Sequence, residues 1–436
     1  MIGDHPAAVN KESRFVMALS HTTESRLDPA TAPVECPVAY GGQKGQRGLD
    51  LTAPLVECDA AGVWHIRGFA EARAVLQSDH TKQAGFNAEM VVMASTLSRQ
   101  PVLYQEGKDH LEQRKQTARF FTPKTVSASY QQLMEQAADR IVNQLKRKRR
   151  ADLSQLSLSL AVQVAGQVVG LTDSRVPGMG GRLEAFFRLP NPNAKPVWLT
   201  RARLIWNTRH LLAFYWLDVL PAIEARRRQP QEDVISHLLE HDYTNREILT
   251  ECVTYAAAGM VTTREFISMA AWHFLDKPAL RARYLVAGDD ERTAMLHEIL
   301  RLEPIVAHLY RRTTGEVRIT SAGQSVVIPE GALIQLHVDA GNADARVTGA
   351  EPLALCPGRP LHAPRAGQML LSFGDGHHRC PGAYIAIQES DIFLCRLLRL
   401  KSLQMEQPPT LTWNELTTGY DLRQFWLRVT PRRPPT

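Results

Sequence analysis

The chain has 436 residues and a formal net charge of +6, and 44% of its residues are hydrophobic. This composition is typical of a protein with a large buried core and excludes a disordered or fibrous chain. The positive charge is too diffuse to indicate a nucleic-acid partner, and no run of about 20 apolar residues predicts a membrane helix.

The first part of the chain predicts an irregular arm followed by one long domain. Residues 1–47 hold several prolines and glycines and are expected to form the arm. Residues 48–436 contain no linker, repeat or low-complexity segment, so we expect a single domain there. Within it, residues 50–67 predict two short strands around a turn. Residues 69–78 predict a helix with one apolar face.

From His110 onward, helical periodicity dominates until Pro304. The predicted helices cover 107–121, 124–149, 153–171, 179–189, 198–228, 231–240, 245–276, 277–286 and 290–302. After Pro304 the pattern changes to short strands, which are predicted at 317–319, 325–328 and 333–337. A last helix at 382–399 is followed by strand-like pieces over 401–430. The fold class is therefore mainly α with a smaller β region.

The most specific pattern is a cysteine in a glycine-rich loop. Residues 373–382 read FGDGHHRCPG and lead into the last predicted helix. Gly374 and Gly376 allow a tight turn with no side chain in the way, so a flat macrocycle could approach the backbone closely. Backbone N–H groups and the start of the following helix would then stabilise a thiolate of Cys380. The loop therefore predicts thiolate ligation of a haem iron.

The remaining cysteines show no pairing pattern. Cys36, Cys58, Cys252, Cys356 and Cys395 are scattered, with no CxxC among them. A disulfide framework is not expected in a chain of this length, and free thiols fit a reducing compartment. The first residues lack the apolar run of a signal peptide. We therefore expect a cytoplasmic protein.

Three further motifs accompany the cysteine loop. Glu298 and Arg301 stand three residues apart, so they can pair on one helical face. His110 and Arg114 stand four apart and can both reach one anionic group. The sequence AAGMVTT at 257–263 combines a glycine with hydroxyl side chains in the longest predicted helix.

These motifs together resemble those of the cytochrome P450 family, and the resemblance extends over about residues 48–430. It implies the triangular-prism fold of that family and a haem b with Cys380 as axial ligand. It also implies that Arg359 joins Glu298 and Arg301 in one buried structural cluster. Arg311 would bind a haem propionate, with the adjacent Arg312 as the alternative. The residues assigned to the cofactor are His110, Arg114, Arg311, Phe373, His378, Cys380 and Gly382.

On the oxygen side, the resemblance assigns catalytic roles within the 257–263 motif. Gly259 would let the helix approach the open face of the iron, and Thr262 would hold a water for proton delivery. The alternative for Thr262 is a hydroxyl turned back onto its own helix carbonyl. The family's usual acid before the threonine is replaced by Val261. Glu265, one turn further on, or Arg264 before it could organise a substitute water chain.

The substrate side is less specific. Residues 181–210 match the position of the family's lid over the substrate channel and are rich in arginines and aromatic residues. They fit either two amphipathic helices with solvated arginines or a lid for a polar, aromatic or anionic substrate. By resemblance, the pocket residues would be Phe86, Met90, Val261, Val306, Leu309 and Tyr420.

The electron donor is expected to be a separate protein. The chain has no flavin or iron–sulfur motif of its own. Basic residues near the cysteine loop, namely Arg114, Lys115, Arg119 and Arg379, would steer an acidic ferredoxin, which a ferredoxin reductase reloads. The expected partners are these two proteins, O2 and a small-molecule or peptide substrate. No nucleic acid, membrane or second subunit is expected.

The sequence thus predicts a P450-type oxidoreductase that monooxygenates an organic small molecule, in bacterial secondary metabolism. Two alternatives remain open at this point. One is oxidative aryl coupling of a peptide or cyclic dipeptide, which Val261 motivates because coupling inserts no oxygen. The other is a non-enzymatic haem sensor.

Overall fold

The computed structural model describes residues 38–45, 49–86, 99–187, 209–362, 367–414 and 417–430. The description below concerns the compact unit Glu35–Thr436. Of residues 1–47, which were expected to form an irregular arm, only 38–45 are described. The N–H of Tyr40 donates to the carbonyl of Leu355, and the N–H of Leu355 donates to the carbonyl of Gly41. Residues 38–45 are therefore bonded to the folded unit.

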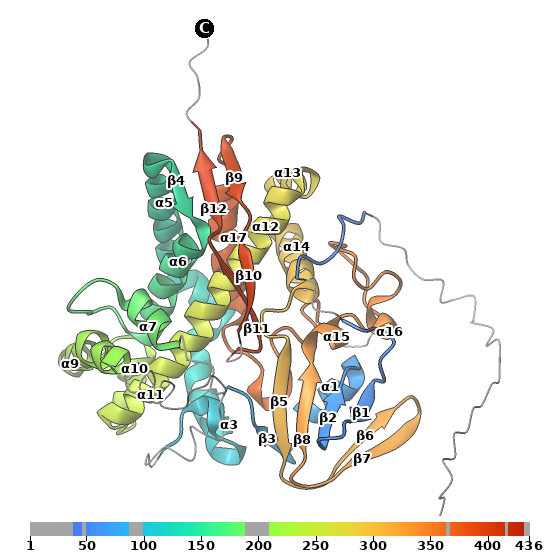
Figure 1. Cartoon of the computed structure of the whole chain (residues 1–436). Coiled ribbons are helices and arrows are strands. Elements are labelled where there is room, and N and C mark those ends of the chain that lie inside the picture. The colour runs from blue at the N-terminus through green and yellow to red at the C-terminus, as the bar shows by residue number, and fades with distance from the viewer. Residues whose placement is uncertain are drawn as a thin grey trace, which may run out of the picture. The chain divides into compact units, whose positions relative to one another are not determined.

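Helices make up most of the described chain (Figure 1), which confirms the mainly α class. The α-helices are α1 (Phe69–Leu76), α3 (Gly107–Thr117), α4 (Pro123–Thr125), α5 (Gln131–Lys148), α6 (Leu153–Val169), α7 (Met179–Phe187), α9 (Leu220–Arg228), α10 (Val234–Glu240), α11 (Asn245–Ala256), α12 (Thr262–Asp276), α13 (Pro278–Val286), α14 (Asp289–Leu302), α15 (Val338–Asn342), α16 (Ala345–Thr348) and α17 (Ala383–Leu398). Three π-helical segments continue α-helices, η4 (Val126–Tyr130), η5 (Tyr215–Val219) and η6 (Ala257–Val261). Short 3-10 turns form η2 (Val102–Tyr104), η3 (Ala118–Phe121) and η7 (Gly376–His378).

The helical core lies where α12 packs against α6 and α17. Each of these helices is apolar over much of its surface, and α12 buries most of its side chains. The segment predicted as one helix over 245–276 is continuous but contains a π-helical segment, η6, between α11 and α12. The start of α11 is set by a capping box between Thr244 and Glu247. This long helix carries the AAGMVTT motif through the middle of the core.

The strands of the described residues form four small sheets. The five-stranded sheet has the order β1 (Val56–Cys58), β2 (Val63–Ile66), β8 (Leu333–His337), β5 (His308–Thr313) and β3 (Thr81–Gln83). The others are β4 (Arg150–Asp152), β12 (Trp426–Val429) and β9 (Leu403–Gln407); β10 (Thr410–Asn414) with β11 (Gly419–Arg423); and β6 (Val317–Ser321) with β7 (Gln324–Ile328). The two strands predicted over 50–67 are confirmed as β1 and β2. The sequence analysis missed β3, β4 and β5.

The five-stranded sheet has two unlike faces because side chains alternate along each strand. Ile66, Ile334 and Leu336 lie on one face and form a second apolar core with residues of α1. Figure 1 shows α1 beside β1 and β2. In the antiparallel pair of β5 and β8, His308 lies opposite His337. Residues opposite each other share a face, so these histidines lie together on the other side of the sheet.

A buried ion cluster joins α14 to the segment that precedes the cysteine loop. The Glu298 carboxylate accepts from Arg301 Nε at 2.7 Å and Nη2 at 2.8 Å, and from Arg359 Nε at 3.3 Å. The N–H of Cys356 also donates to Glu298 at 2.9 Å. The three charged side chains are almost inaccessible to solvent. The structure thus brings together the three residues that were assigned to a structural cluster.

The two arginines of this cluster also hold the backbone. Arg301 donates to the carbonyls of Asn342, Pro352 and Ala354. Arg359 donates to the carbonyls of Thr348, Ala350, Glu351 and Ala354. Because each guanidinium carries five donors, one buried arginine can satisfy several carbonyls of an irregular segment. The loop between α16 and the cysteine loop is therefore held without regular secondary structure.

Two expectations from the sequence concern membrane helices and cysteines. Within the described residues, no helix is long and apolar enough to cross a membrane. Cys58, Cys252, Cys380 and Cys395 are free thiols. Cys356, however, is disulfide-bonded, which corrects the expectation that it is a free buried cysteine.

We predict that Glu298→Gln destabilises the fold by about 3–5 kcal/mol, because it leaves two buried guanidinium groups without their carboxylate. Thermal unfolding and haem content measure the effect. Glu316→Gln is the matched control, since Glu316 pairs with Arg318 at 2.6 Å on the surface, with exposed side chains. The control should cost at most about 1 kcal/mol. Equal melting temperatures for both variants would contradict the structural role of Glu298.

Candidate functional site

The cysteine loop turns sharply just before α17. The N–H of Cys380 donates to the carbonyl of Phe373 at 2.9 Å, which closes the loop. Gly374 and Gly376 have φ values of 67° and 65°, in the left-handed region that favours glycine. A Cβ on Gly376 would overlap the carbonyl oxygen of Leu76. The two glycines thus serve the turn, and Gly376 also serves close packing against the end of α1.

A short polar network ties the loop to α1. Asp375 accepts from Arg73 Nε at 2.5 Å and from Gln77 Nε2 at 3.1 Å. The same carboxylate accepts from the N–H of Gly376, which begins η7. Since Arg73 and Gln77 both belong to the C-terminal part of α1, this end of the helix sets the position of the loop.

The surroundings of Cys380 suit a thiol that becomes a thiolate on metal binding. Burial raises the pKa of Cys380, while the N–H of Gly382 and the charges of Arg114 and Arg379 act in the opposite direction. Such a thiol is a poor free nucleophile but has donors arranged to stabilise its anion. The chemistry of this loop therefore fits an axial ligand to iron.

Polar side chains from α3 gather beside the loop. The rings of His110 and His378 stack with centroids 4.1 Å apart, and His378 Nε2 lies 3.0 Å from a carboxylate oxygen of Glu106. Arg114 donates to the carbonyl of Arg379. Burial, His378 and Arg114 lower the pKa of His110 to about 4, so this ring is neutral at pH 7. The predicted pair of His110 and Arg114 therefore lies against the cysteine loop.

Arg311 is the strongest indication of an anionic group at this site. Its side chain is 4% exposed and hydrogen-bonds to the side chain of Gln83 and the carbonyl of Tyr310. Burial lowers the pKa of Arg311 to about 10, with the charge of Glu106 opposing. Within the described residues, no carboxylate forms an ion pair with Arg311. A buried guanidinium in this state fits a propionate of the haem that the loop predicts.

The structure also separates Arg311 from Arg312. Adjacent residues of β5 point to opposite faces of the sheet. Arg311 is buried, whereas the side chain of Arg312 donates to the carbonyl of Gly331 near the surface. Arg311 is therefore the one that faces the cysteine loop side.

The oxygen-side motif lies in the π-helical segment and the first turn of α12. The Thr262 hydroxyl donates to the carbonyl of Ala258, one turn back. This is the back-bonded arrangement that the sequence analysis held as the alternative. π-Helical turns commonly occur at functional sites because they shift the register of the side chains. Rotation about χ1 would release the hydroxyl for a water.

Gly259 lies in η6, next to α6. A Cβ on Gly259 would lie 3.4 Å from the Cβ of Ala165 on α6. The small size of the glycine therefore permits close packing of η6 on α6, and its assignment to the oxygen-binding side stays a prediction.

Glu265 is also not available as an acid. Its Oε1 accepts from Arg264 Nε and from Arg423 Nη1, each at 2.7 Å, and its Oε2 accepts from the N–H of Leu422 at 2.7 Å. Arg264 in turn pairs with Glu184 on α7 at 3.0 Å. Both oxygens of Glu265 thus hold a buried cluster that joins α7, α12 and β11. This corrects its assignment to a proton-carrying water chain.

Comparison with known proteins supports the fold. Residues 292–419 match the family model described as Cytochrome P450. The match spans the Glu298 cluster, Arg311 and the cysteine loop.

This stretch of the chain matches the cytochrome P450 family.

Two curated relatives and one solved structure agree with this assignment. "Biotin biosynthesis cytochrome P450" of Bacillus subtilis is 26% identical over 353 residues, 78% of this chain and 84% of the relative. "Nocardicin C N-oxygenase" of Nocardia uniformis is 25% identical over 406 residues, 88% of this chain and 94% of the relative. The crystal structure of P450BioI with a fatty-acid-ligated acyl carrier protein superposes with a TM-score of 0.67 at 23% identity, covering 84% of this chain and 92% of that one. Members of this family are monooxygenases that hold haem through a cysteine thiolate.

The P450 holds a buried acid that the sequence analysis missed. Glu389 lies on α17 and is buried against α12, where the Thr263 hydroxyl hydrogen-bonds to it. Its Oε2 is buried and accepts no hydrogen bond within the described residues. Burial raises the pKa of Glu389 to about 8, so the carboxyl is protonated at neutral pH. The signal was present in the sequence, because Glu389 falls between apolar residues on the buried side of a strongly apolar helix.

The predicted substrate-side residues of the P450 are only partly gathered. Val306 forms a β-bridge with Gly419, which places it beside β11. Leu309 lies on the face of the sheet toward Gly374, whereas Tyr420 is buried and donates to the carbonyl of Glu303. Phe86 has a positive φ, and its carbonyl accepts from Tyr104. Val261 ends η6, one residue before Thr262.

Part of the substrate side lies outside the described residues. This holds for Met90 and for most of the predicted lid at 181–210. Of the lid residues that are described, Arg182 pairs with Asp218 at 2.6 Å and Glu184 pairs with Arg264. These two charges therefore stabilise the attachment of α7.

The basic residues near the cysteine loop present a surface to solvent. Lys115, Arg119 and Arg379 are exposed, and Arg114 is held by the carbonyl of Arg379. This group of cations lies on the loop side of the haem site.

We predict that Glu389 makes the stability of the P450 fall as the pH rises. Its folded pKa is about 8, above the ordinary value of 4.5, so the unfolded chain releases a proton that the folded chain keeps. Stability should therefore fall between about pH 4.5 and 8, by up to about 1.4 kcal/mol per pH unit. Glu389→Gln should remove this slope, and Glu316→Gln should keep it. The free energy of unfolding, measured with denaturant at several pH values, gives this slope. Parallel plots of that free energy against pH for wild type and Glu389→Gln would contradict the assignment.

Proposed function

We propose that this P450 monooxygenates an organic small molecule in a bacterial biosynthetic pathway, with haem b as its prosthetic group. The observations that carry the proposal are the closed glycine loop at Cys380 and the buried guanidinium of Arg311, which has no ion-pair partner in the described chain. In this proposal Cys380 holds the iron, and Arg311, His110 and Arg114 hold the propionates. Thiolate ligation favours cleavage of the O–O bond, so the bound haem supplies the oxygen-activating chemistry.

The residues of this chain have three tasks in that reaction. The cysteine loop keeps water and other side chains away from the sulfur by packing tightly on α1. The neutral ring of His110 and the guanidinium groups supply donors for the carboxylates of the haem edge. The helix at Thr262 positions a hydroxyl where protons must arrive. These tasks are binding, orientation and proton supply.

Proton supply is proposed to run from Glu389 through Thr263 to the region of Thr262. Val261 offers no acid, and Glu265 is committed to two arginines. Glu389 is linked to this region because Thr263, which hydrogen-bonds to it, directly follows Thr262. A carboxyl with a pKa near 8 can both give and regain a proton at neutral pH. Ordered water would complete the path.

Names of the curated relatives support a biosynthetic substrate. One relative is named for biotin biosynthesis and the other for N-oxygenation of nocardicin C. Electrons are proposed to come from a separate ferredoxin and its reductase. Lys115, Arg119 and Arg379 form an exposed basic surface next to the thiolate loop, which suits an acidic donor.

The first test concerns Cys380. Cys380→Ala should abolish the long-wavelength Soret band of the reduced carbon monoxide complex, because that band reports a thiolate ligand. Cys395→Ala is the matched control, since Cys395 is also a free thiol and lies buried on α17. The control should retain the band. Retention of the band in Cys380→Ala would overturn the ligand assignment.

The second test concerns proton delivery. Thr262→Ala should leave haem content and the carbon monoxide spectrum intact but lower the ratio of product to NADPH severalfold, with peroxide released instead. Thr254→Ala is the matched control, because Thr254 is back-bonded to Thr250 on the same long helix. Glu389→Gln should lower the ratio in the same way as Thr262→Ala. An unchanged ratio in both variants would show that protons arrive by another route.

Oxidative coupling is the second candidate, because Val261 replaces the usual acid. The two reactions differ in where oxygen goes. Monooxygenation places one atom of O2 in the product, whereas coupling places none. Turnover under ¹⁸O2 therefore separates them: one labelled atom in the product supports monooxygenation, and an unlabelled coupled product replaces the proposal.

A further inference from the structure

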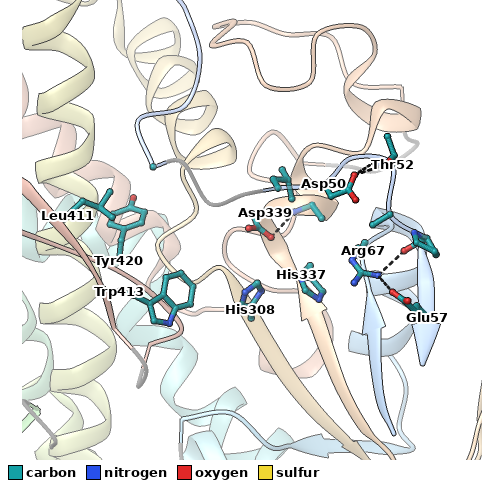
Figure 2. Close-up of a pocket in the computed structure, with 15 residues that line it drawn as sticks. Asp50, Thr52, Glu57, Arg67, His308, His337, Asp339, Leu411, Trp413 and Tyr420 are labelled. Atoms are coloured by element: carbon teal, nitrogen blue, oxygen red, sulfur yellow. Dashed lines mark hydrogen bonds and ion pairs between the residues drawn. The ribbon is translucent and has the colours of Figure 1, made fainter. Parts of the chain in front are cut away.

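A cavity of about 860 Å³ lies on the face of the five-stranded sheet opposite α1. Figure 2 shows His308, His337 and Asp339 at its base, with Trp413 and Tyr420 from the β10–β11 hairpin on another side. None of the reactions above uses the two histidines or Asp339. We propose that these three side chains form a binding site for a divalent transition-metal ion of the Zn²⁺ type, separate from the haem iron.

The fold brings the three residues together from two strands and one helix. His308 begins β5, His337 ends β8, and the two lie opposite each other in the antiparallel register. Asp339 follows two residues after His337, in the first turn of α15. One potential ligand atom of each residue lies within 4.8 Å of those of the other two. Two imidazoles and a carboxylate are a typical ligand set for zinc and related ions.

Asp339 needs a cation. Its side chain is 6% exposed, and Oδ1 accepts from the N–H of Ala340 at 2.8 Å. Within the described chain, no lysine, arginine or histidine forms an ion pair with it. A buried carboxylate without a counter-charge is costly, and a bound metal ion supplies that charge.

Hydrogen bonds fix the tautomer of His337. Asp59 Oδ2 lies 3.1 Å from His65 Nε2, and His65 Nδ1 lies 3.0 Å from His337 Nε2. Because a carboxylate only accepts, His65 Nε2 carries the proton, and with His65 Nδ1 as the acceptor His337 Nε2 is the donor, which leaves a lone pair on His337 Nδ1. A histidine that donates its second N–H to an outer partner is the usual arrangement of a metal ligand.

The charge state of the cavity favours a cation. The described lining residues include three carboxylates, Asp50, Glu57 and Asp339, and one guanidinium, that of Arg67. Arg67 is paired with Glu57 at 2.9 Å. The described lining of the cavity is therefore negatively charged, although the net charge of the chain is +6.

Three protein ligands leave a coordination position for a further group. That position would open toward the cavity, where Trp413, Leu411 and Tyr420 supply apolar surface. The site would therefore hold the metal together with water or a ligand in the cavity.

A second group of potential ligands gives a matched control. His237, Glu240 and His241 also bring their ligand atoms within 4.8 Å of one another, on and just after α10. There His241 Nδ1 is engaged with the carbonyl of His237 at 2.9 Å, and Glu240 and His241 are exposed. The buried cavity group is the better site, because it has an outer-shell partner and an uncompensated carboxylate.

The test is zinc binding to metal-stripped, haem-loaded protein without a histidine tag, by calorimetry and by zinc per chain after gel filtration. We expect one tightly bound zinc ion. His308→Ala, His337→Ala and Asp339→Asn should each weaken binding at least about tenfold, and His65→Ala should weaken it about 10- to 100-fold. The double variant His237→Ala/His241→Ala should bind as the wild type does.

The shift in melting temperature that zinc causes is a second readout. Each variant is compared with itself, with and without zinc, so a difference in stability between variants does not affect the result. Zinc should raise the melting temperature of the wild type and of the α10 double variant, but not that of the nearly isosteric Asp339→Asn. Three results would overturn the proposal: no stoichiometric zinc in the wild type, unchanged affinity in His308→Ala and Asp339→Asn, or loss of zinc only in the α10 double variant.

Discussion

The haem site depends on the hydrogen bonds and ion pairs that the buried carboxylate of Glu298 accepts. It binds Arg301 from its own helix, Arg359 from a loop and the N–H of Cys356. The two arginines then satisfy backbone carbonyls from Asn342 to Ala354, so a long irregular segment is held by charge-assisted hydrogen bonds. Such a cluster is stable only when all its members are present. The cysteine loop follows this segment, so its position depends on the cluster at one end and on the contact of Gly376 with α1 at the other.

A second constraint is that the two buried acids near α12 have different roles. Glu265 and Glu389 are both fully buried, but their surroundings differ. Glu265 meets two arginines and a backbone N–H, which oppose the rise in its pKa that burial causes, so both of its oxygens hold neighbouring groups. Glu389 meets a threonine hydroxyl in an apolar environment, which raises its pKa to about 8 and keeps its proton. The same side-chain type is therefore an anchor in one place and a candidate proton source in the other.

The five-stranded sheet separates two sites through the alternation of its side chains. On β5, Leu309 and Arg311 face the cysteine loop and the α1 side, whereas His308 faces the cavity of Figure 2. One strand thus contributes to the haem site with one face and to the proposed metal site with the other. This arrangement also means that a metal in the cavity would be held by the strand that carries Arg311.

The sequence alone determined the mainly α class, the cysteine loop and the pairing of Glu298 with Arg301, because each depends on residues close together in the chain. Glycines at fixed offsets, an i, i+3 spacing and helical periodicity are local properties. Only the tertiary structure decided the rest. The short strands β3, β4 and β5 form because partners from distant segments pair with them, and the choice between Arg311 and Arg312 follows from that pairing. Likewise Gly259 faces α6, Glu265 faces Arg423 and Glu389 faces Thr263 because of how α12 packs. Which face of an element meets which neighbour is a property of packing between segments that are far apart in the chain, and no local pattern encodes it.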